Sequence, residues 1–105
     1  MRRGEVWWAE LAEEAGFRPV VIVSADATIP GRSSITIAEV TRVVRSIPSE
    51  VLLSTDDGMP TDCVINIGNL QTISKDRLRE KITALSEEKL FALSRALHYS
   101  LDLEW

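Results

Sequence analysis

The chain has 105 residues, of which 45% are hydrophobic and 27% are charged, and its formal net charge is −4. This composition is typical of one folded globular domain and excludes a disordered tail or a collagen-like rod. A net negative charge also excludes the general electrostatic attraction of a basic nucleic-acid binder, so any site for RNA or DNA has to be a local basic patch.

The cysteine content and the length of the apolar runs indicate the cellular compartment in which the protein is expected. Cys63 is the only cysteine, so no disulfide forms within the chain, which fits a reducing cytoplasm. The apolar run at 20–23 is far too short to span a bilayer, and Arg2 and Arg3 are followed by Gly4 and Glu5 rather than by the apolar segment of a signal peptide. We therefore expect a cytoplasmic protein without membrane association, folded as a single domain over 1–105. The small core of such a domain favours a second copy.

Residues 4 to about 74 are predicted to form a series of short strands. Stretches with the β-branched and aromatic residues typical of strands lie at 4–11, 18–24, 34–40, 50–54, 63–67 and 70–73. Asp57, Gly58 and Pro60 are turn residues between two of these runs. Short strands at this close spacing predict a small, strongly curved antiparallel sheet or barrel.

The hydrophobic period changes after the strands. Ser86 suits a helix N-cap, Glu87 and Glu88 suit the positive first turn, and Leu85 with Leu90 fits a hydrophobic staple. Leucines then recur at three- and four-residue spacing: Leu90, Leu93, Leu97 and Leu101. Strands followed by one terminal helix predict the α+β class.

Four segments occur in a distinctive order. They are Arg-Gly-Glu-Val-Trp at 3–7, Arg-Pro-Val-Val-Ile-Val-Ser at 18–24, residues 38–42 running into 47–51, and residues 58–66 continuing to 73. In this order and spacing they resemble the MazF/PemK/Kid family of toxin endoribonucleases, and 96–103 resembles the last helix of that family. The resemblance implies a small SH3-like antiparallel β-barrel with a C-terminal helix, a fold shared with the CcdB-type gyrase poisons.

The same resemblance implies a function. Family members are toxins of type II toxin–antitoxin systems that slow growth. They cut single-stranded RNA such as mRNA at short sequences, without a metal or another cofactor. The ribose 2′-OH attacks the adjacent phosphate and leaves a 2′,3′-cyclic phosphate and a 5′-OH end. The resemblance also implies a homodimer and a MazE-like antitoxin whose acidic C-terminal segment holds the enzyme inactive.

Arg18 and Thr41 are the residues on which the resemblance places catalysis. A guanidinium stays charged and can donate two parallel hydrogen bonds to phosphate oxygens. Pro19 restricts the preceding residue to extended geometry, which would present Arg18 at a strand start. The Thr41 hydroxyl would position the phosphate and hydrogen-bond it in the transition state. Without the family pattern, the two would be interpreted as an exposed strand-edge arginine and an ordinary β-former.

Other polar, cationic and aromatic residues of the matching segments are expected to bind substrate. Arg42 and Arg45 would widen the positive patch around Thr41, and Trp8, the freer of two adjacent tryptophans, would stack on a base or contact a second copy. Side chains of the last strands would read base edges or merely satisfy backbone groups. The full set expected to bind substrate is Trp8, Pro19, Ser24, Arg42, Arg45, Asn66, Asn69 and Gln71.

The remaining titratable residues are weaker candidates. His98 lies in the predicted helix, where a structural or exposed histidine is expected, and Cys63 is expected to be an inert buried thiol. One cysteine and one histidine cannot supply a classical zinc site, and no glycine-rich phosphate loop is present. No metal site is therefore predicted.

The chain also departs from the family pattern. The Kid/PemK branch has an Arg-x-Asp step that is thought to act as acid and base, but Asn66-Ile67-Gly68 stands there in this chain. Arg18 and Thr41 would then carry the reaction alone. The loop at 10–17, which gates the substrate groove in the family, is short.

Two other functions remain open at this stage. A CcdB-like gyrase poison shares the fold and acts without catalysis through residues near its C-terminus, and this chain ends in Glu104-Trp105. An inactive regulatory barrel is the third possibility. Arg18-Pro19 and Thr41 favour the nuclease.

Overall fold

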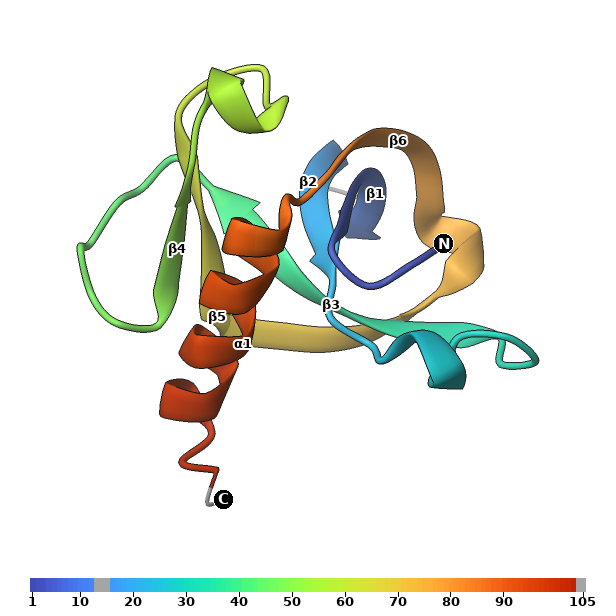
Figure 1. Ribbon diagram of the computed structural model, residues 1–105. Helices are drawn as coiled ribbons and strands as arrows, with labels where there is room; N and C mark the ends of the chain where they lie inside the picture. The colour runs from blue at the N-terminus through green and yellow to red at the C-terminus, as the bar shows by residue number, and fades with distance from the viewer. Residues whose placement is uncertain (13–15, 104–105) are drawn as a thin grey trace.

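The computed structural model describes residues 1–12 and 16–103 (Figure 1). Its strands and its α-helix follow in this order: β1 (Glu5–Ala12), β2 (Gly16–Ile22), β3 (Ser34–Thr41), β4 (Glu50–Leu53), β5 (Cys63–Ser74), β6 (Leu78–Ala84) and α1 (Glu87–Ser100). Short 3₁₀ helices connect some of them: η1 (Asp26–Thr28), η2 (Thr55–Asp57) and η3 (Lys75–Arg77). The centre of the predicted gating loop, 13–15, and the terminal Glu104-Trp105 lie outside the described residues.

The strands form one antiparallel sheet in the order β4-β5-β3-β2-β1-β6. Figure 1 shows the sheet curling so that β1, β2 and β6 wrap around one end, while α1 lies across β4 and β5 at the other. The sheet is a partly closed barrel with β4 and β6 as its edges. The predicted α+β class, with a curved antiparallel sheet and a C-terminal helix, is confirmed.

Two strand predictions are corrected. The runs at 63–67 and 70–73 are one continuous strand, β5, which spans an irregularity: Glu39 pairs with Asn66, whereas Ala38 pairs with Leu70. The second correction is β6, which was not predicted. Its sequence Leu-Arg-Glu-Lys-Ile-Thr-Ala has no clean apolar alternation, because it is an edge strand whose charged side chains are exposed.

Two hydrophobic clusters lie on opposite faces of the same strands. Val21 belongs to the cluster that α1 covers, whereas its neighbours Val20 and Ile22 belong to the cluster inside the curl of β1, β2 and β3. Successive side chains of a strand point to opposite faces, so a strand buried on both sides has a continuous apolar sequence. This explains the unbroken run at 20–23.

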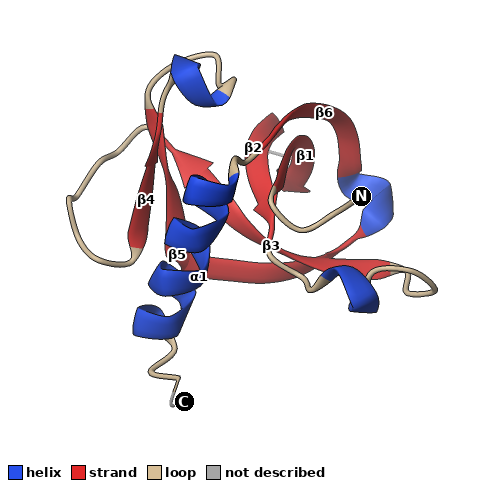
Figure 2. Cartoon of the chain, in the orientation of Figure 1, coloured by secondary structure: helices blue, strands red, loops and turns tan. Residues whose placement is uncertain are grey.

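Helix α1 begins as predicted and closes the first cluster. The Ser86 hydroxyl accepts a hydrogen bond from the Lys89 backbone N–H at 3.2 Å, and Leu93 is fully buried. Leu101 follows the last helical residue and is 52% exposed, so the predicted leucine stripe ends before it. Figure 2 shows this helix against the strands. No helix in the described ranges is long and apolar enough to cross a membrane.

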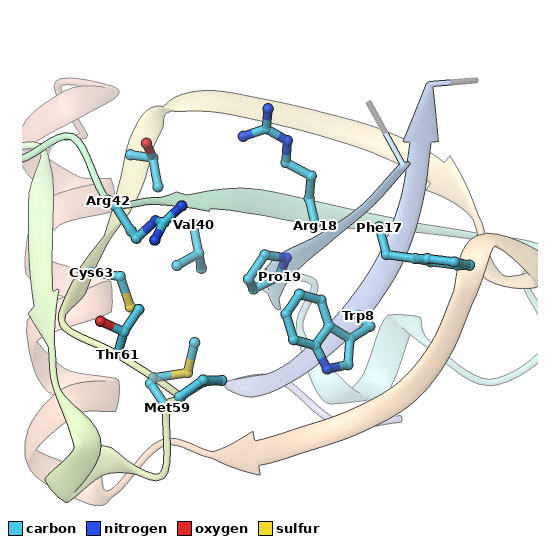
Figure 3. A pocket seen from close by; sticks show the side chains of 11 residues that line it. Trp8, Phe17, Arg18, Pro19, Val40, Arg42, Met59, Thr61 and Cys63 are labelled. Carbon is cyan, nitrogen blue, oxygen red and sulfur yellow. The ribbon is translucent and has the colours of Figure 1, made fainter. Parts of the chain in front are cut away.

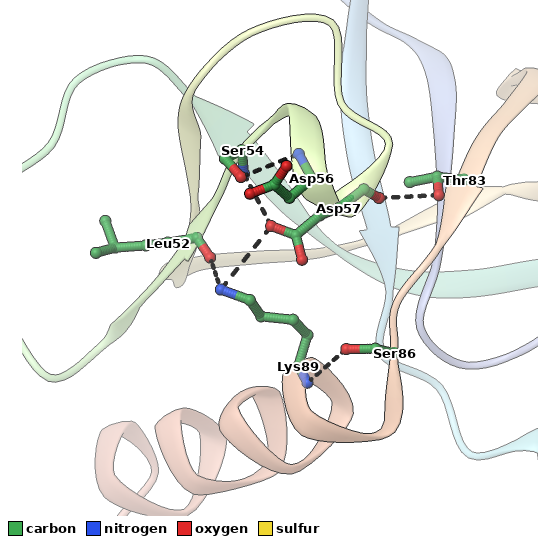
Figure 4. A network of polar contacts seen from close by, with 7 residues as sticks. All are labelled: Leu52, Ser54, Asp56, Asp57, Thr83, Ser86 and Lys89. Atoms are coloured by element: carbon green, nitrogen blue, oxygen red, sulfur yellow. Dashed lines mark hydrogen bonds and ion pairs between the residues drawn. The ribbon is translucent and has the colours of Figure 1, made fainter.

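Polar contacts fasten the start of α1 to the turn between β4 and β5 (Figure 4). The Lys89 ammonium donates to the Leu52 carbonyl at 2.5 Å and lies 3.9 Å from the Asp57 carboxylate. That carboxylate accepts from the Ser54 backbone N–H, and the Thr83 hydroxyl donates to the Asp57 carbonyl. Strand β6, helix α1 and η2 are thereby held together.

Candidate functional site

A pocket of about 440 Å³ opens at one end of the sheet. It lies beyond the point where the paired residues of β2 and β3 end, at Val20 and Glu39. Figure 3 shows the side chains that line it. They come from β1, β2, β3 and the loop after it, the segment before β5 and the start of β5: Trp8, Phe17, Arg18, Pro19, Val40, Thr41, Arg42, Met59, Pro60, Thr61 and Cys63.

The apolar lining of this pocket is the uncovered end of the cluster beneath α1. Val40, Met59 and Cys63 are buried members of that cluster and also border the pocket. Burial raises the pKa of the Cys63 thiol, and the negative charges of Asp57 and Asp62 raise it further. Cys63 is thus a buried, protonated thiol, as predicted, and it is unsuited to nucleophilic attack.

A tight turn after η2 positions one wall of the pocket. Gly58 ends η2 with φ of +91°, and a Cβ at this position would lie 2.5 Å from the Thr83 hydroxyl oxygen. Only glycine meets both conditions without strain. The turn places Met59, Pro60 and Thr61 opposite β2 and β3, and the Lys89–Asp57 contacts fix its base.

Arg18 and Thr41 lie together on one face of the sheet. Val20 pairs with Glu39, and continuing that antiparallel register by two residues brings Arg18 level with Thr41. By strand alternation, both side chains leave the sheet on the face opposite Pro19 and Val40. In Figure 3 the Arg18 guanidinium points away from Trp8 and Met59. The structure therefore brings the two predicted catalytic residues together at the pocket's polar side.

Both groups are free to bind an anion. Arg18 is exposed, and within the described residues its guanidinium has no hydrogen-bond or ion-pair partner. The Thr41 hydroxyl oxygen accepts from the Val43 backbone N–H at 3.2 Å. That contact uses an oxygen lone pair and leaves the hydroxyl proton available for donation. The pair can therefore offer several donors to one phosphate group.

The loop after β3 carries the other predicted cations. Arg42 is exposed and lines the pocket, whereas Arg45 does not line it. The Glu50 carboxylate accepts from the backbone N–H groups of Arg45 and Ser46, each at 2.9 Å in its shorter contact. Glu50 therefore fixes this loop without neutralising either guanidinium.

The adjacent tryptophans divide as predicted between the two faces of β1. Trp7 packs against the cluster inside the curl, and its indole N–H donates to the Glu5 carboxylate at 2.9 Å. Trp8 is half-buried and lines the pocket, where it neighbours Phe17, which is 59% exposed. Trp8 and Phe17 also border a second, shallower pocket with Arg79 and Glu80.

The predicted polar residues of β5 do not line the pocket. Asn66 is paired with Glu39 on β3, and its side-chain oxygen accepts from the Gly68 backbone N–H at 3.1 Å. The side-chain amides of Asn69 and Gln71 both donate to Glu39. These residues lie farther along the sheet from the pocket, and their expected role in binding substrate stays a prediction.

Ser24 lies at the other end of β2. Its hydroxyl accepts from the Thr36 backbone N–H at 2.9 Å and borders a separate small pocket with Arg32 and Thr72. The structure therefore places Ser24 away from Arg18 and Thr41.

Sequence reasoning missed several residues at and around the site. Phe17, Met59 and Thr61 line the pocket, and Glu39 holds two of the amides that were predicted to bind substrate. Of these residues, only Phe17 could have been found from the sequence, because it is an aromatic residue directly before the Arg18-Pro19 motif. The part of the chain that the structure describes contains no group of three or more histidine, cysteine, aspartate or glutamate side chains that could hold a metal ion.

Known proteins resemble this chain both in sequence and in fold. Probable endoribonuclease MazF5 of Mycobacterium tuberculosis is 36% identical over 101 residues, covering 95% of this chain and 92% of its own. Endoribonuclease MazF9 of the same species is 37% identical over 115 residues, covering 98% of both.

Solved structures show the same similarity in fold. A mycobacterial endoribonuclease in complex with its cognate antitoxin superimposes with a TM-score of 0.89 and 28% identity, covering 100% of this chain and 98% of its own. The model of the PemK-like, MazF-like toxins of type II toxin–antitoxin systems matches residues 2–101. With that match and relatives above 30% identity over nearly its whole length, this chain belongs to the PemK-like, MazF-like toxin family.

Proposed function

We propose that this chain is the toxin of a type II toxin–antitoxin pair. In this proposal it is an endoribonuclease that cleaves single-stranded RNA, with Arg18 and Thr41 as its catalytic residues. The family match and the relatives that are named endoribonucleases support the activity. One observation supports the assignment of the site most directly. The Arg18 guanidinium and the Thr41 hydroxyl, both with donors open to a ligand, lie at the ends of neighbouring strands beside a pocket. Residues 1–105 act as one toxin domain in this proposal.

The chemistry is an in-line attack within the RNA. The 2′-oxygen forms a bond to the adjacent phosphorus as its proton leaves, and the bond from phosphorus to the 5′-oxygen breaks as that oxygen gains a proton. The products are a 2′,3′-cyclic phosphate and a 5′-OH end. Negative charge builds on the non-bridging phosphate oxygens, where preorganised donors lower the barrier most.

Each residue has a separate part in this reaction. Arg18 donates two parallel hydrogen bonds to the phosphate oxygens, and its positive charge stays in place throughout. The Thr41 hydroxyl donates a hydrogen bond to the same phosphate, while its oxygen accepts from the Val43 backbone N–H. Arg42, exposed at the pocket rim, adds local positive charge on a chain whose net charge is −4. The cations supply the charge stabilisation without a metal in this proposal.

The gyrase-poison alternative is not favoured. Several relatives above 30% identity are named endoribonucleases. The Glu104-Trp105 end that suggested the alternative lies outside the described residues.

We propose two macromolecular partners, with RNA as the substrate in the cytoplasm. One partner is a second copy of the chain, for which exposed apolar residues of β4 and of the loop before it provide a surface: Val43 (60% exposed), Val44 (49%) and Leu52 (58%). Sedimentation at micromolar concentration should then give about twice the monomer mass. The other is an antitoxin, as in the mycobacterial complex, with an acidic segment that meets the same arginines that bind RNA phosphates.

The test is RNA cleavage in EDTA by the wild type and by Arg18→Ala. Loss of this charged donor should lower kcat/KM roughly 10²- to 10³-fold, by analogy with removal of one transition-state donor. Arg32→Ala is the matched control, since Arg32 is also exposed but lies at the other end of the strands. Wild-type cleavage rates in a natively folded Arg18→Ala protein would contradict the assignment.

A further inference from the structure

Glu39 is a carboxylate that the proposed reaction does not use. One of its oxygens, Oε2, accepts from the Asn69 side-chain amide at 2.5 Å and from the Gln71 side-chain amide at 2.9 Å. Its other oxygen, Oε1, has no hydrogen-bond or ion-pair partner among the residues described. Two donors thus fix the orientation of the carboxylate while one acceptor oxygen stays open.

The fold places this carboxylate next to the candidate catalytic pair. Glu39 and Thr41 are two residues apart on β3 with no irregularity between them, so their side chains share a face. Val20, which pairs with Glu39, is two residues from Arg18 on β2. Glu39 is therefore about one pleat repeat, roughly 7 Å, along the sheet from the row of Arg18 and Thr41.

The irregularity in β5 brings Asn69 and Gln71 to Glu39. The residues between Asn66 and Leu70 have no partner on β3, and Gly68 lets the strand bend: a Cβ there would lie 3.2 Å from the Asn66 side-chain oxygen. Bulges of this kind commonly redirect side chains beside functional sites. The bend sets two amide groups against one carboxylate.

The cluster formed by Glu39, Asn69 and Gln71 has a defined hydrogen-bonding character. A carboxylate only accepts hydrogen bonds, and each amide directs N–H groups at Glu39, so its carbonyl oxygen is left for other donors. A negative acceptor cluster repels phosphate, so it does not serve the RNA backbone. It suits a group that offers N–H donors, and exocyclic amino groups of nucleobases are such donors.

On the basis of the proposed RNA cleavage, we propose that Glu39 is a specificity-determining residue. It holds Asn69 and Gln71 in one orientation, and its Oε1 accepts an N–H from the base-pairing edge of a nucleobase next to the scissile phosphate. Cytosine, adenine and guanine offer an amino group there. Uracil offers a single N–H between two carbonyl oxygens that the carboxylate repels, and is disfavoured.

The experiment first maps the cleavage sites of the wild type in random-sequence RNA by capturing 5′-OH ends. Oligonucleotides then differ at one position near the cut: cytosine against uracil, adenine against purine, and guanine against hypoxanthine. The last two pairs differ only by the amino group. The wild type should favour the amino-bearing base at one position by roughly 10- to 100-fold in kcat/KM, the range of one good base contact.

Glu39→Gln should lower this preference at least about 10-fold, through a loss of kcat/KM that is confined to RNAs carrying the amino group at that position. Glu88→Gln is the matched control, since it removes the same charge from the exposed first turn of α1 and should keep the preference. Glu39→Asp keeps the charge but shortens the side chain, and it should also lose preference. It provides a second variant if Glu39→Gln does not fold, as judged by circular dichroism.

The outcomes separate this inference from the proposed function. No cleavage by the wild type contradicts the proposed function itself. Cleavage with no amino-group preference, or with a preference that Glu39→Gln leaves unchanged, overturns the role of Glu39 and leaves the nuclease intact. An equal loss of rate on all RNAs with a changed pH–rate profile also overturns it, because Glu39 would then take part in proton transfer rather than in base reading.

Discussion

Both faces of β2 and β3 are buried along the middle of the strands, and they differ from each other at the pocket end of the sheet. On one face, Val21 and Val40 pack into the cluster that α1 closes with Leu93. On the other face, at the strand ends, Arg18 and Thr41 keep donors that no described side chain occupies. At this end of the strands, one residue along the chain therefore separates a packed apolar side chain from one with an open hydrogen-bond donor.

Stability and activity should therefore respond to different substitutions, although the residues are neighbours in sequence. Buried apolar residues on the helix side contribute through packing, and their loss leaves a cavity. Uncommitted polar groups on the other side contribute little to folding because solvent already satisfies them. Three substitutions examine this separation.

The largest effect is expected for Leu93→Ala. Leu93 is fully buried between α1 and the sheet, so the substitution should lower the free energy of unfolding by about 2–5 kcal/mol. Denaturant unfolding followed by circular dichroism measures this, with Leu101→Ala as the control, since Leu101 is 52% exposed. The cleavage rate per folded molecule should stay unchanged, and a lower rate in a protein of wild-type stability would show that the two faces are not separate in function.

A smaller effect is expected for Thr41→Val, which removes the hydroxyl and keeps the β-branched shape. The rate should fall roughly 10- to 100-fold, less than for Arg18→Ala, because a neutral donor makes a weaker hydrogen bond to phosphate than a charged one. Thr36→Val on the same strand is the control, since its hydroxyl contacts Thr72 instead. Equal rates for both variants would remove Thr41 from the reaction.

The smallest effect concerns Glu5, a carboxylate whose contacts are inside the fold, in contrast to the open oxygen of Glu39. Burial by itself raises the pKa of Glu5, but hydrogen bonds from Trp7 and the Arg2 backbone, with the Lys81 ammonium, outweigh it and lower the pKa below its ordinary value of 4.5. Because the folded-state pKa is the lower one, this stabilisation is present above about the ordinary value and is lost as pH falls through the folded-state pKa.

Glu5→Gln should therefore lower the free energy of unfolding by about 1 kcal/mol at pH 7, with a smaller difference from the wild type as the pH falls below the ordinary value. Denaturant titrations at several pH values measure the difference. A gap that widens toward low pH would show that the lowered pKa does not stabilise the fold.

Local sequence features predicted most of the architecture, because they act over a few residues. The strands came from β-branched runs, and the helix start came from Ser86 and the acids behind it, where the structure shows the cap. Strand β6 was not predicted, because this edge strand has no continuous buried face that would impose an alternation of apolar and polar residues. The two runs that form β5 were separated because a bend with Gly68 looks like a break when only neighbours are considered.

The sequence alone was enough to propose the candidate catalytic residues and the alternation of each strand: Arg18 before Pro19, Thr41 at a strand end, and a group of polar side chains in β5. Which of these residues come into contact depends on the tertiary fold. Asn69 and Gln71 lie 30 and 32 residues from Glu39, and their contact depends on the register of β3 against β5 and on the unpaired residues that shift it. Register is a property of strand pairing, and it is set by packing on both faces of the sheet rather than by any single run of residues.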